Sequence, residues 1–364
     1  MIALSFENRG QSAIVAERTN ILAVFPSNRR TGDSPRTMTP DFLPSADLAI
    51  LQQRAKLLAS VRAFFVEHGY WECETPILSR DIVVDANLDP FELTDGGERW
   101  FLQTSPEAGM KRLLAAGATA IFQVSRVFRR GESGPRHNPE FTMIEWYRVG
   151  DDHFAQMEVT EQLVRAVFQT AGRELPPEPF ERLTYGAAFE RYAGTRVLSL
   201  PSAALVDLAR SHNLEVPDSL PLDDRDGWLN LLLAELVEPH LGTDHPVFLH
   251  DYPASQAALA VLRADPGQPP VAERFELYLS GVELCNGYHE LTDPDAFAAR
   301  TEEERAIRRS QNTPDLPGAP MLEAALRHGT PQSSGVALGF DRLAMLALNL
   351  PTIQHVITFP MSRA

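Results

Sequence analysis

The twenty residues from Phe128 to Tyr147, FRRGESGPRHNPEFTMIEWY, carry most of the information about the fold. They run from an arginine pair through a Gly/Pro-rich loop and His-Asn-Pro into a segment of alternating residue types. Because successive side chains of a strand point to opposite faces, this segment predicts a strand with two distinct faces. One face takes Phe141, Met143, Glu145 and Tyr147, and the other takes Thr142, Ile144 and Trp146. A carboxylate and a phenol then share a face with two large apolar side chains.

This segment has two interpretations. It could be an ordinary amphipathic hairpin with Glu145 in solvent, since half-buried hairpins are common. Alternatively, Glu145 is buried in a binding site and Arg129, at the end of the preceding strand, lies beside it. A guanidinium next to a buried carboxylate suits a zwitterion or a phosphate, and we favour this interpretation.

The chain on either side of this hairpin predicts an α+β fold. The expected strands are Trp100–Gln103, Ala120–Arg129, Glu140–Arg148, Arg274–Asn286 and Ser334–Leu338, and the expected helices are Leu48 to about Gly69, Pro106–Ala116 and one from Asp341. Residues 153–170 and 200–240 look mainly helical, and we expect a helical insertion at about 153–245. Strands that follow one another as hairpins, with helices around them, indicate an antiparallel sheet flanked by helices. We expect a flexible N-terminal arm at 1–44, because Ser27–Pro44 is rich in Ser, Thr, Pro and Arg, and one domain at 45–364.

A second informative segment is Arg274–Thr292, RFELYLSGVELCNGYHELT. Glu283 and Glu290 are seven residues apart and would point to opposite faces of a regular strand. We expect Asn286–Gly287 to break the strand so that both carboxylates turn toward one site. Paired carboxylates beside a polyphosphate commonly hold Mg²⁺. The alternative is two surface glutamates that flank a turn.

A third segment is Ser334–Leu346, SGVALGFDRLAML, a strand of small residues followed by a helix start. Gly335 and Gly339 permit close approach of a ligand to the backbone, and Arg342 projects from the first turn of the helix. Taken alone, the segment is more typical of an ordinary strand-to-helix junction than of a binding site.

The composition is that of an ordinary globular protein. Of the 364 residues, 44% are hydrophobic and 23% are charged, which argues against wholesale disorder. The formal charge, 33 minus 49 or −16, gives no overall attraction for nucleic-acid phosphates.

Cys73 and Cys285 have no metal-ligand spacing, so we expect a reducing, cytoplasmic compartment. No apolar stretch approaches the roughly 20 residues that span a bilayer, and the GxxxxGKS/T and GxGxxG loops are absent from the sequence.

Together the three segments resemble the class II aminoacyl-tRNA synthetases, and specifically the catalytic domain of lysyl-tRNA synthetases. Tyr70–Pro76 is similar to the end of motif 1, Phe128–Tyr147 to the motif 2 hairpin, and Gly335–Arg342 to motif 3. Arg274–Thr292 is similar to the lysine-specific stretch that precedes motif 3. The resemblance covers about Ser45 to the C-terminus. It implies an AMP-forming ligase that uses ATP and Mg²⁺ to activate a lysine-like amino acid, and a homodimer.

The resemblance also implies roles for individual residues. Arg129 would hold the amino-acid carboxylate and the α-phosphate of ATP, Arg342 would hold the γ-phosphate, and Phe141 would stack on adenine. Glu283, with Glu290, would hold Mg²⁺. The other residues implied along ATP are Arg130, Gly131, Glu132, His137, Asn138, Leu284 and Gly339. The amino-acid pocket would comprise Ser105, Pro106, Glu107, Glu145, Tyr147, Asn286, Tyr288 and Glu290.

The sequence departs from the lysyl-tRNA synthetase pattern in three ways. Gly131 stands where those enzymes usually have Glu, with Glu132 next, so either position could contact adenine. Ala337 replaces a glycine of motif 3, which fits a shifted amino group and an expected preference for (R)-β-lysine over lysine. The 44 residues before Ser45 are too few for the anticodon-binding OB barrel, a feature that resembles the truncated paralogues that lysylate elongation factor P. We therefore expect elongation factor P as the acceptor; tRNA charging and a non-catalytic regulatory binder are the alternatives.

Overall fold

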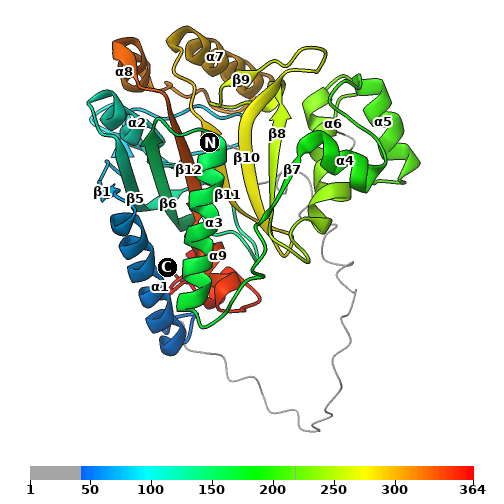
Figure 1. The fold of residues 1–364 in the computed structure, drawn as a ribbon. Helices are drawn as coiled ribbons and strands as arrows, with labels where there is room; N and C mark the ends of the chain where they lie inside the picture. Colours follow the sequence, from blue (N-terminus) through cyan, green and yellow to red (C-terminus); the bar gives the residue numbers. More distant parts are fainter. Residues whose placement is uncertain (1–41, 218) are drawn as a thin grey trace, which may run out of the picture.

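The computed structural model describes residues 42–217 and 219–364, so nearly all of the predicted arm, 1–44, lies outside the described residues. The main strands are β1 (Trp71–Glu72), β5 (Ala120–Phe128), β6 (Glu140–Val149), β7 (Glu181–Thr184), β8 (Val247–Pro253), β9 (Leu262–Arg263), β10 (Val271–Leu279), β11 (Val282–His289) and β12 (Ser333–Gly339). They form one sheet in the order β1-β5-β6-β12-β11-β10-β8-β7, with β9 paired to β10 (Figure 1). All neighbours are antiparallel except β1 with β5 and β7 with β8. The predicted α+β class with a mainly antiparallel sheet is confirmed.

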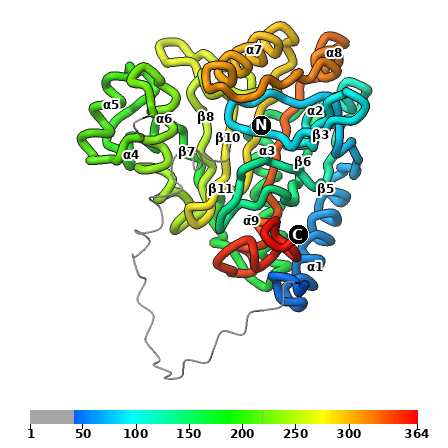
Figure 2. Tube along the Cα trace, turned by 180° about the vertical axis from the view of Figure 1, so that it is seen from behind, coloured from blue at the N-terminus to red at the C-terminus, as the bar shows by residue number. Residues whose placement is uncertain are grey.

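Helices surround this sheet. They are α1 (Leu48–Glu67), α2 (Glu107–Ala115), α3 (His153–Thr170), α4 (Tyr185–Ala193), α5 (Ser202–Ser211), α6 (Arg225–Leu232), α7 (Pro294–Ser310), α8 (Pro320–Gly329) and α9 (Phe340–Ala347), with short helical turns η1 (Leu233–Val237), η2 (Glu238–His240), η3 (Ala254–Gln256), η4 (Ile353–His355) and η5 (Met361–Arg363). A small second sheet has the order β2-β4-β3, with β2 (Leu78–Ser79), β3 (Glu92–Asp95) and β4 (Glu98–Leu102). Helices α2, α7 and α8 gather at one end of the main sheet, and the trace seen from behind has α4, α5 and α6 beyond its β7–β8 edge (Figures 1 and 2).

Helix α1 lies against the sheet because its apolar side chains recur every three or four residues. Leu57, Val61 and Phe65 are buried in one core with residues of α3, α9, β10 and β12. Gly69 follows the helix with φ +79°, a left-handed conformation that costs glycine little, so the predicted helix end is confirmed. Leu48, at the start of the expected apolar stripe, is 70% exposed and does not belong to the buried face.

A buried ion pair joins α1 to α9. Arg54 Nη1 lies 2.6 Å from Asp341 Oδ1, and Arg54 Nη2 donates to Thr142 Oγ1 of β6 at 2.9 Å. The backbone N–H of Thr142 donates to Asp341 Oδ2 at 2.9 Å. Helix α1 and the segments that resemble motifs 2 and 3 are therefore connected through charge-assisted hydrogen bonds.

The residues expected as one helical insertion, about 153–245, divide between two places. Helix α3 packs with α1 in the core on the sheet. Helices α4, α5 and α6 instead form a second apolar cluster that includes residues of β7 and β8. We therefore propose that only the second group is an addition to the catalytic core.

The two faces predicted for Glu140–Arg148 are confirmed. Ile144 and Trp146 lie in the core beneath α1 and α3, whereas Met143 joins the cluster on the other face. Glu145 is fully buried, so the interpretation that leaves it in solvent is wrong.

Strand β11 contains a β-bulge. Leu277 of β10 pairs with Cys285, but the next residue, Tyr278, pairs with Glu283. Leu284 is thus an extra residue without a partner of its own, and such a residue resets the alternation of side chains along a strand. Glu283 faces the same way as its partner Tyr278.

This bulge corrects the expectation that Asn286–Gly287 breaks the strand. Both residues stay in the ladder, paired with β10 and with β12. Asn286 donates to Glu276, and Glu276 also accepts from Tyr278, so these residues share a face with Glu283. The bulge alone aligns Glu283 with the polar face of β11.

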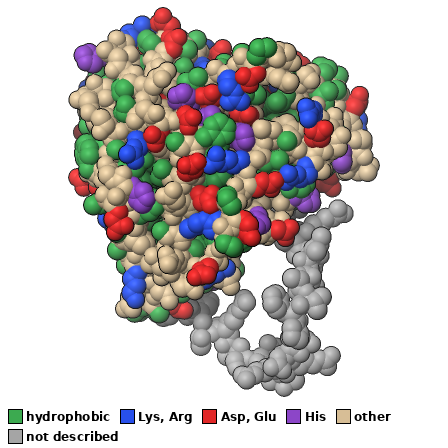
Figure 3. Space-filling model, viewed as in Figure 1, with side chains coloured by type: hydrophobic (Ala, Val, Ile, Leu, Met, Phe, Trp, Pro, Cys, Tyr) green, Lys and Arg blue, Asp and Glu red, His purple; other side chains and the backbone are tan. Residues whose placement is uncertain are grey.

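Side chains of both charges are interspersed over the face seen in Figure 3. No helix within the described residues is long and apolar enough to cross a bilayer.

Candidate active site

The predicted site residues meet on the sheet face opposite α1 and α3. Glu145 of β6, Ala337 of β12 and Asn286 of β11 are paired across three neighbouring strands. Since cross-strand partners share a face, their side chains form one row across the sheet. Tyr147 and Tyr288 flank Gly335 in the next row of the same face.

One half of the site is built around Arg129, which follows β5 and is 2% exposed. Its guanidinium carbon lies 5.1 Å from the centroid of the Phe141 ring, and Nη1 lies 3.7 Å from Glu132 Oε1. Nη1 has no hydrogen-bond partner within the described part of the chain. Burial raises the pKa of Glu132, and Arg129 and Arg342 oppose this shift. A guanidinium donor that lacks a hydrogen-bond partner and lies beside an aromatic ring suits a ligand with both a phosphate and an aromatic base, such as a nucleotide.

Arg342 supplies a second guanidinium from the first turn of α9. It donates to the carbonyls of Glu283 and Arg136 at 2.9 and 3.2 Å, and its Nη2 contacts His137 Nε2 at 2.5 Å. Burial, together with Arg342 and Arg129, lowers the pKa of His137 to about 3. His137 is therefore neutral at physiological pH, and its Nε2 can accept a hydrogen bond from the Arg342 guanidinium.

A small pocket lies between these groups. Its lining comprises Glu132, Arg136, His137, Asn138, Phe141, Leu284, Gly339, Asp341, Arg342 and Ile353. Seven of the residues predicted along ATP are among them, while Arg136, Asp341 and Ile353 carried no predicted role. Arg130 points away, with a 58% exposed side chain and Nη2 3.6 Å from Asp89 Oδ2. Gly131 has φ +86° in the turn between β5 and β6 and does not line this pocket.

The other half of the site holds a buried lysine that the sequence analysis did not single out. Lys111 of α2 contacts Glu107 Oε1 at 2.7 Å and Glu290 Oε2 at 2.5 Å. All three side chains are at most 3% exposed. A lysine in a helix more often lies at the surface, so the sequence offered only the spacing of four residues between Glu107 and Lys111 as a sign of this pair.

The charges of this triad are unequal. Burial would raise the pKa of Glu107, but Lys111 overrides burial and lowers it to about 2. Burial raises the pKa of Glu290 to about 7, because the attraction of Lys111 is opposed by repulsion from Glu107. Burial would lower the pKa of Lys111, but both carboxylates raise it. Lys111 therefore stays charged, and Glu290 is the member of the triad that titrates near neutrality.

Glu145 and Tyr147 complete the acidic pocket. The hydroxyl of Tyr147 donates to Glu145 Oε1 at 2.5 Å. Burial, reinforced by Glu107, raises the pKa of Glu145 well above its ordinary value. The buried hydroxyl of Tyr288 has no hydrogen-bond partner within residues 42–217 and 219–364. Ser105 accepts a hydrogen bond from the backbone of Glu107 at 3.3 Å and, with Pro106, sets the start of α2.

Gly335 has a different role from the one expected. A Cβ there would lie 2.2 Å from the Tyr147 ring and 2.7 Å from Glu290 Oε1. The absence of a side chain at Gly335 thus lets Tyr147 and Glu290 lie close to the backbone of β12, in addition to any ligand. Ala337, between Glu145 and Asn286, adds its methyl group to the same pocket face.

A second ion pair missed by the sequence analysis supports the pocket from β10. Arg274 Nη2 lies 2.5 Å from Glu276 Oε1, and both side chains are 5% exposed. Glu276 also accepts from Tyr252 and from Asn286. This network fixes Asn286, which the sequence placed in the amino-acid pocket.

The two glutamates expected to share Mg²⁺ contact different cations. Glu283 Oε2 lies 3.9 Å from Arg342 Nη1, and its buried Oε1 has no hydrogen-bond partner among the described residues. A buried carboxylate oxygen beside the phosphate-type arginine fits Mg²⁺, which prefers oxygen ligands. Glu290 is already neutralised by Lys111 and fits a metal less well.

Comparison with known proteins agrees with this geometry. A family model described as tRNA synthetases class II (D, K and N) matches residues 41–363. The chain belongs to this family. Its relatives include proteins named elongation factor P–(R)-β-lysine ligase. The one from Yersinia enterocolitica is 43% identical over 90% of this chain and 99% of the relative. The one from Vibrio cholerae is 42% identical over 89% of this chain and 99% of the relative. A ligase of the same name from Haemophilus influenzae is 43% identical over 88% and 98%. The chain is therefore a ligase of the class II synthetase family.

Proposed function

We propose that this ligase activates (R)-β-lysine, or lysine, with ATP and transfers it to a lysine side chain of elongation factor P. The observation that carries the proposal is the pairing of two half-sites on one sheet face. Arg129, Arg342 and Phe141 suit a nucleotide, and the acidic pocket around Glu107 and Glu290 suits a cationic amino acid.

In the first step, a carboxylate oxygen of the amino acid attacks the α-phosphorus of ATP, and pyrophosphate leaves with the electron pair of the broken P–O bond. Arg129 would stabilise the charge that develops on the α-phosphate, because its Nη1 is buried and lacks a hydrogen-bond partner in the described chain. Arg342 would hold the distal phosphates. Mg²⁺, held by Glu283, would neutralise charge on the pyrophosphate. Catalysis by these residues is positioning and electrostatic stabilisation.

In the second step, the ε-amine of an acceptor lysine attacks the carbonyl carbon of the aminoacyl-adenylate. An amide forms, AMP leaves, and the amine loses one proton to solvent. The relatives from Yersinia and Vibrio are named for elongation factor P, and the chain covers 99% of each. Their names support elongation factor P, in preference to tRNA, as the acceptor.

The acidic pocket would select a doubly cationic amino acid. Glu107 and Glu145 would face one ammonium group, while Glu290 and Tyr147 would bind the terminal one. An uncharged side chain would forgo the charge-assisted contact with Glu290, which disfavours its binding. The methyl group of Ala337 narrows the pocket face beside Glu145, and this supports (R)-β-lysine as the preferred isomer.

We also propose a cytoplasmic homodimer, related by a twofold axis through the region of α1 and β1. Apolar side chains are exposed along this one stretch of chain: Leu48, Val66, Trp71, Ile77 and Leu78. A second copy that covers them would remove their apolar surface from water.

Pyrophosphate exchange with lysine and with (R)-β-lysine tests the activation step. Incubating the enzyme, ATP and each isomer with elongation factor P or with total tRNA tests the acceptor, and intact mass identifies which one gains the aminoacyl group. Efficient charging of tRNA with unmodified elongation factor P would overturn the acceptor. Absence of exchange with either isomer would favour a non-catalytic binder.

A further inference from the structure

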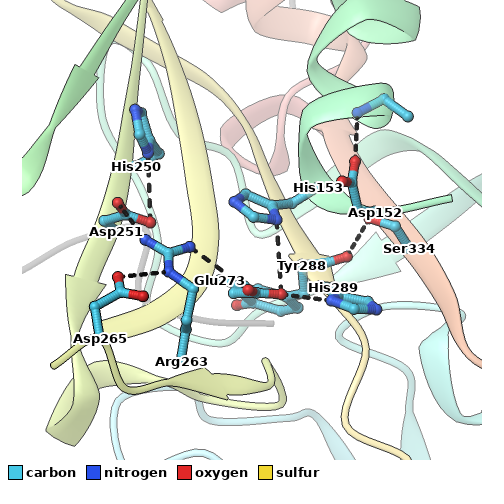
Figure 4. A network of polar contacts seen from close by, with 11 residues as sticks. Asp152, His153, His250, Asp251, Arg263, Asp265, Glu273, Tyr288, His289 and Ser334 are labelled. Atoms are coloured by element: carbon cyan, nitrogen blue, oxygen red, sulfur yellow. Dashed lines mark hydrogen bonds and ion pairs between the residues drawn. The ribbon is translucent and has the colours of Figure 1, made fainter. Parts of the chain in front are cut away.

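A cluster of histidine and glutamate lies on the opposite sheet face from the amino-acid pocket (Figure 4). It consists of His153 at the start of α3, Glu273 of β10 and His289 at the end of β11. Within the described residues, no other group of three His, Cys, Asp or Glu side chains has ligand atoms this close together. His289 is flanked in sequence by Tyr288 and Glu290, which point to the other face.

The distances in this cluster fit a metal ion. Glu273 Oε2 lies 2.5 Å from His289 Nδ1 and 3.8 Å from His153 Nδ1. Two ligands that are each about 2.1 Å from one ion can be no more than about 4.2 Å apart. The separation between Glu273 and His153 satisfies this limit, and the 2.5 Å contact between Glu273 and His289 is a hydrogen bond that would open to admit the ion. The three side chains come from three distant segments of the chain.

His153 gives an independent reason to expect a ligand. Its side chain is 2% exposed, and neither ring nitrogen has a hydrogen-bond partner within the described residues. An unsatisfied buried polar group costs about 1–3 kcal/mol.

The surroundings orient the carboxylate and supply negative charge. Arg263 Nη1 lies 3.5 Å from Glu273 Oε1, which leaves Oε2 facing the two histidines. Ligating carboxylates are commonly held by such a second contact. Asp251 and Asp152, as well as Glu273, act electrostatically on His153. Their charge opposes the repulsion that a cation would feel at the N-terminal end of α3.

We propose that His153, Glu273 and His289 bind one divalent transition-metal ion, for which Zn²⁺ is the best match. Two imidazoles and one carboxylate are typical zinc ligands that leave a fourth position for water. The side chains of Glu273 and His289 are 15% and 19% exposed, so this fourth position borders solvent. The ion would connect α3 to β10 and β11 directly behind the amino-acid pocket.

The test uses the untagged, full-length protein with Mg²⁺ in excess, so that the oxygen-rich nucleotide site is occupied. Equilibrium dialysis against Zn²⁺, followed by elemental analysis, should give one retained equivalent, and Co²⁺ should give a saturable visible absorption band. His153→Gln and Glu273→Gln should each lose the retained ion and the band. His250→Gln is the matched control, because His250 is buried nearby but belongs to a pair with Asp251.

Thermal unfolding separates loss of the site from loss of the fold. Zn²⁺ should raise the melting temperature of the wild type and of His250→Gln, and leave that of folded His153→Gln unchanged. A wild-type protein that retains no Zn²⁺ and shows no Co²⁺ band would overturn the proposal, and the cluster would then be a hydrogen-bonded triad. Equal Zn²⁺ retention by the wild type and both ligand variants would overturn it as well.

Discussion

Lys111 of α2 and Glu290, which follows β11, form a solvent-excluded ion pair with 2.5 Å between Nζ and Oε2. The pKa of Glu290 is nevertheless raised to about 7, because burial and Glu107 oppose Lys111. The Glu290 carboxylate therefore takes up a proton as the pH falls through neutrality, whereas an exposed glutamate would do so near pH 4.

We expect this titration to control amino-acid binding. Between pH 8 and pH 6 most of the Glu290 carboxylate would become protonated, so the KM for lysine in pyrophosphate exchange should rise as the pH falls. The kcat should change less, because in the proposed binding mode the Glu290 carboxylate contacts the substrate side chain and not the reacting phosphorus. Glu290→Gln should have a high KM at both pH values; a variant that keeps the wild-type pH dependence would assign it to another group.

Replacing Arg129 should abolish most activation. Arg129→Ala removes a buried donor that we propose binds the α-phosphate, and we expect exchange to fall by about 100- to 1000-fold. Arg126→Ala is the control, because Arg126 is a 45% exposed residue of the same strand whose ion pair with Glu140 spans 3.7 Å. It should retain near-wild-type exchange, since exposed pairs contribute little. Equal loss in the two variants, with both proteins folded, would contradict the assigned role.

Ala337 should determine the preference between lysine isomers. Ala337→Gly enlarges the pocket beside Glu145 and Asn286, so the ratio of kcat/KM for lysine to that for (R)-β-lysine should rise. One methyl group corresponds to about 1–3 kcal/mol, or roughly 10- to 200-fold in this ratio. Exchange kinetics with both isomers provide the measurement. An unchanged ratio would exclude Ala337 as the selecting residue.

The proposed dimer predicts a sensitive surface at β1. Trp71 is 50% exposed, and Trp71→Glu should shift sedimentation toward the 40.4 kDa monomer. Leu262→Glu changes a comparably exposed strand residue, 46% exposed in β9, and should leave the dimer intact. If wild-type protein at micromolar concentration sediments as a monomer, the dimer proposal is wrong.

The sequence predicted best what depends on local periodicity. The alternation in Glu140–Arg148 correctly separated Glu145 from Trp146, because Ile144 and Trp146 place large apolar side chains on one face of that strand. The pattern of α1 and the glycine that ends it were also sufficient to predict a helix. The motif residues that meet in the nucleotide pocket followed from the resemblance, and the structure brings seven of them together.

The features that depend on tertiary contacts were not predictable in this way. Lys111 gives no local indication of burial, because its partner Glu290 is far along the chain. The bulge at Leu284 depends on how β10 and β11 pair, so the sequence analysis assigned the change of face to Asn286–Gly287 instead. His153 belongs to a helix start, and its proximity to Glu273 and His289 arises only when α3 packs on the sheet.

The bulge and the alternation in β11 also constrain the length of this strand. From Cys285 to Glu290, residues of the amino-acid pocket alternate with residues of the opposite face, including His289. A substitution can alter one face alone, but losing one residue here would turn every later side chain to the wrong side. Leu284 is the exception, because it has no partner in β10 and its removal would keep the pairing on both sides. We therefore expect deletion variants of this hairpin to keep the fold only when the gap falls at the bulge, which makes β11 tolerant of changed side chains and intolerant of changed length.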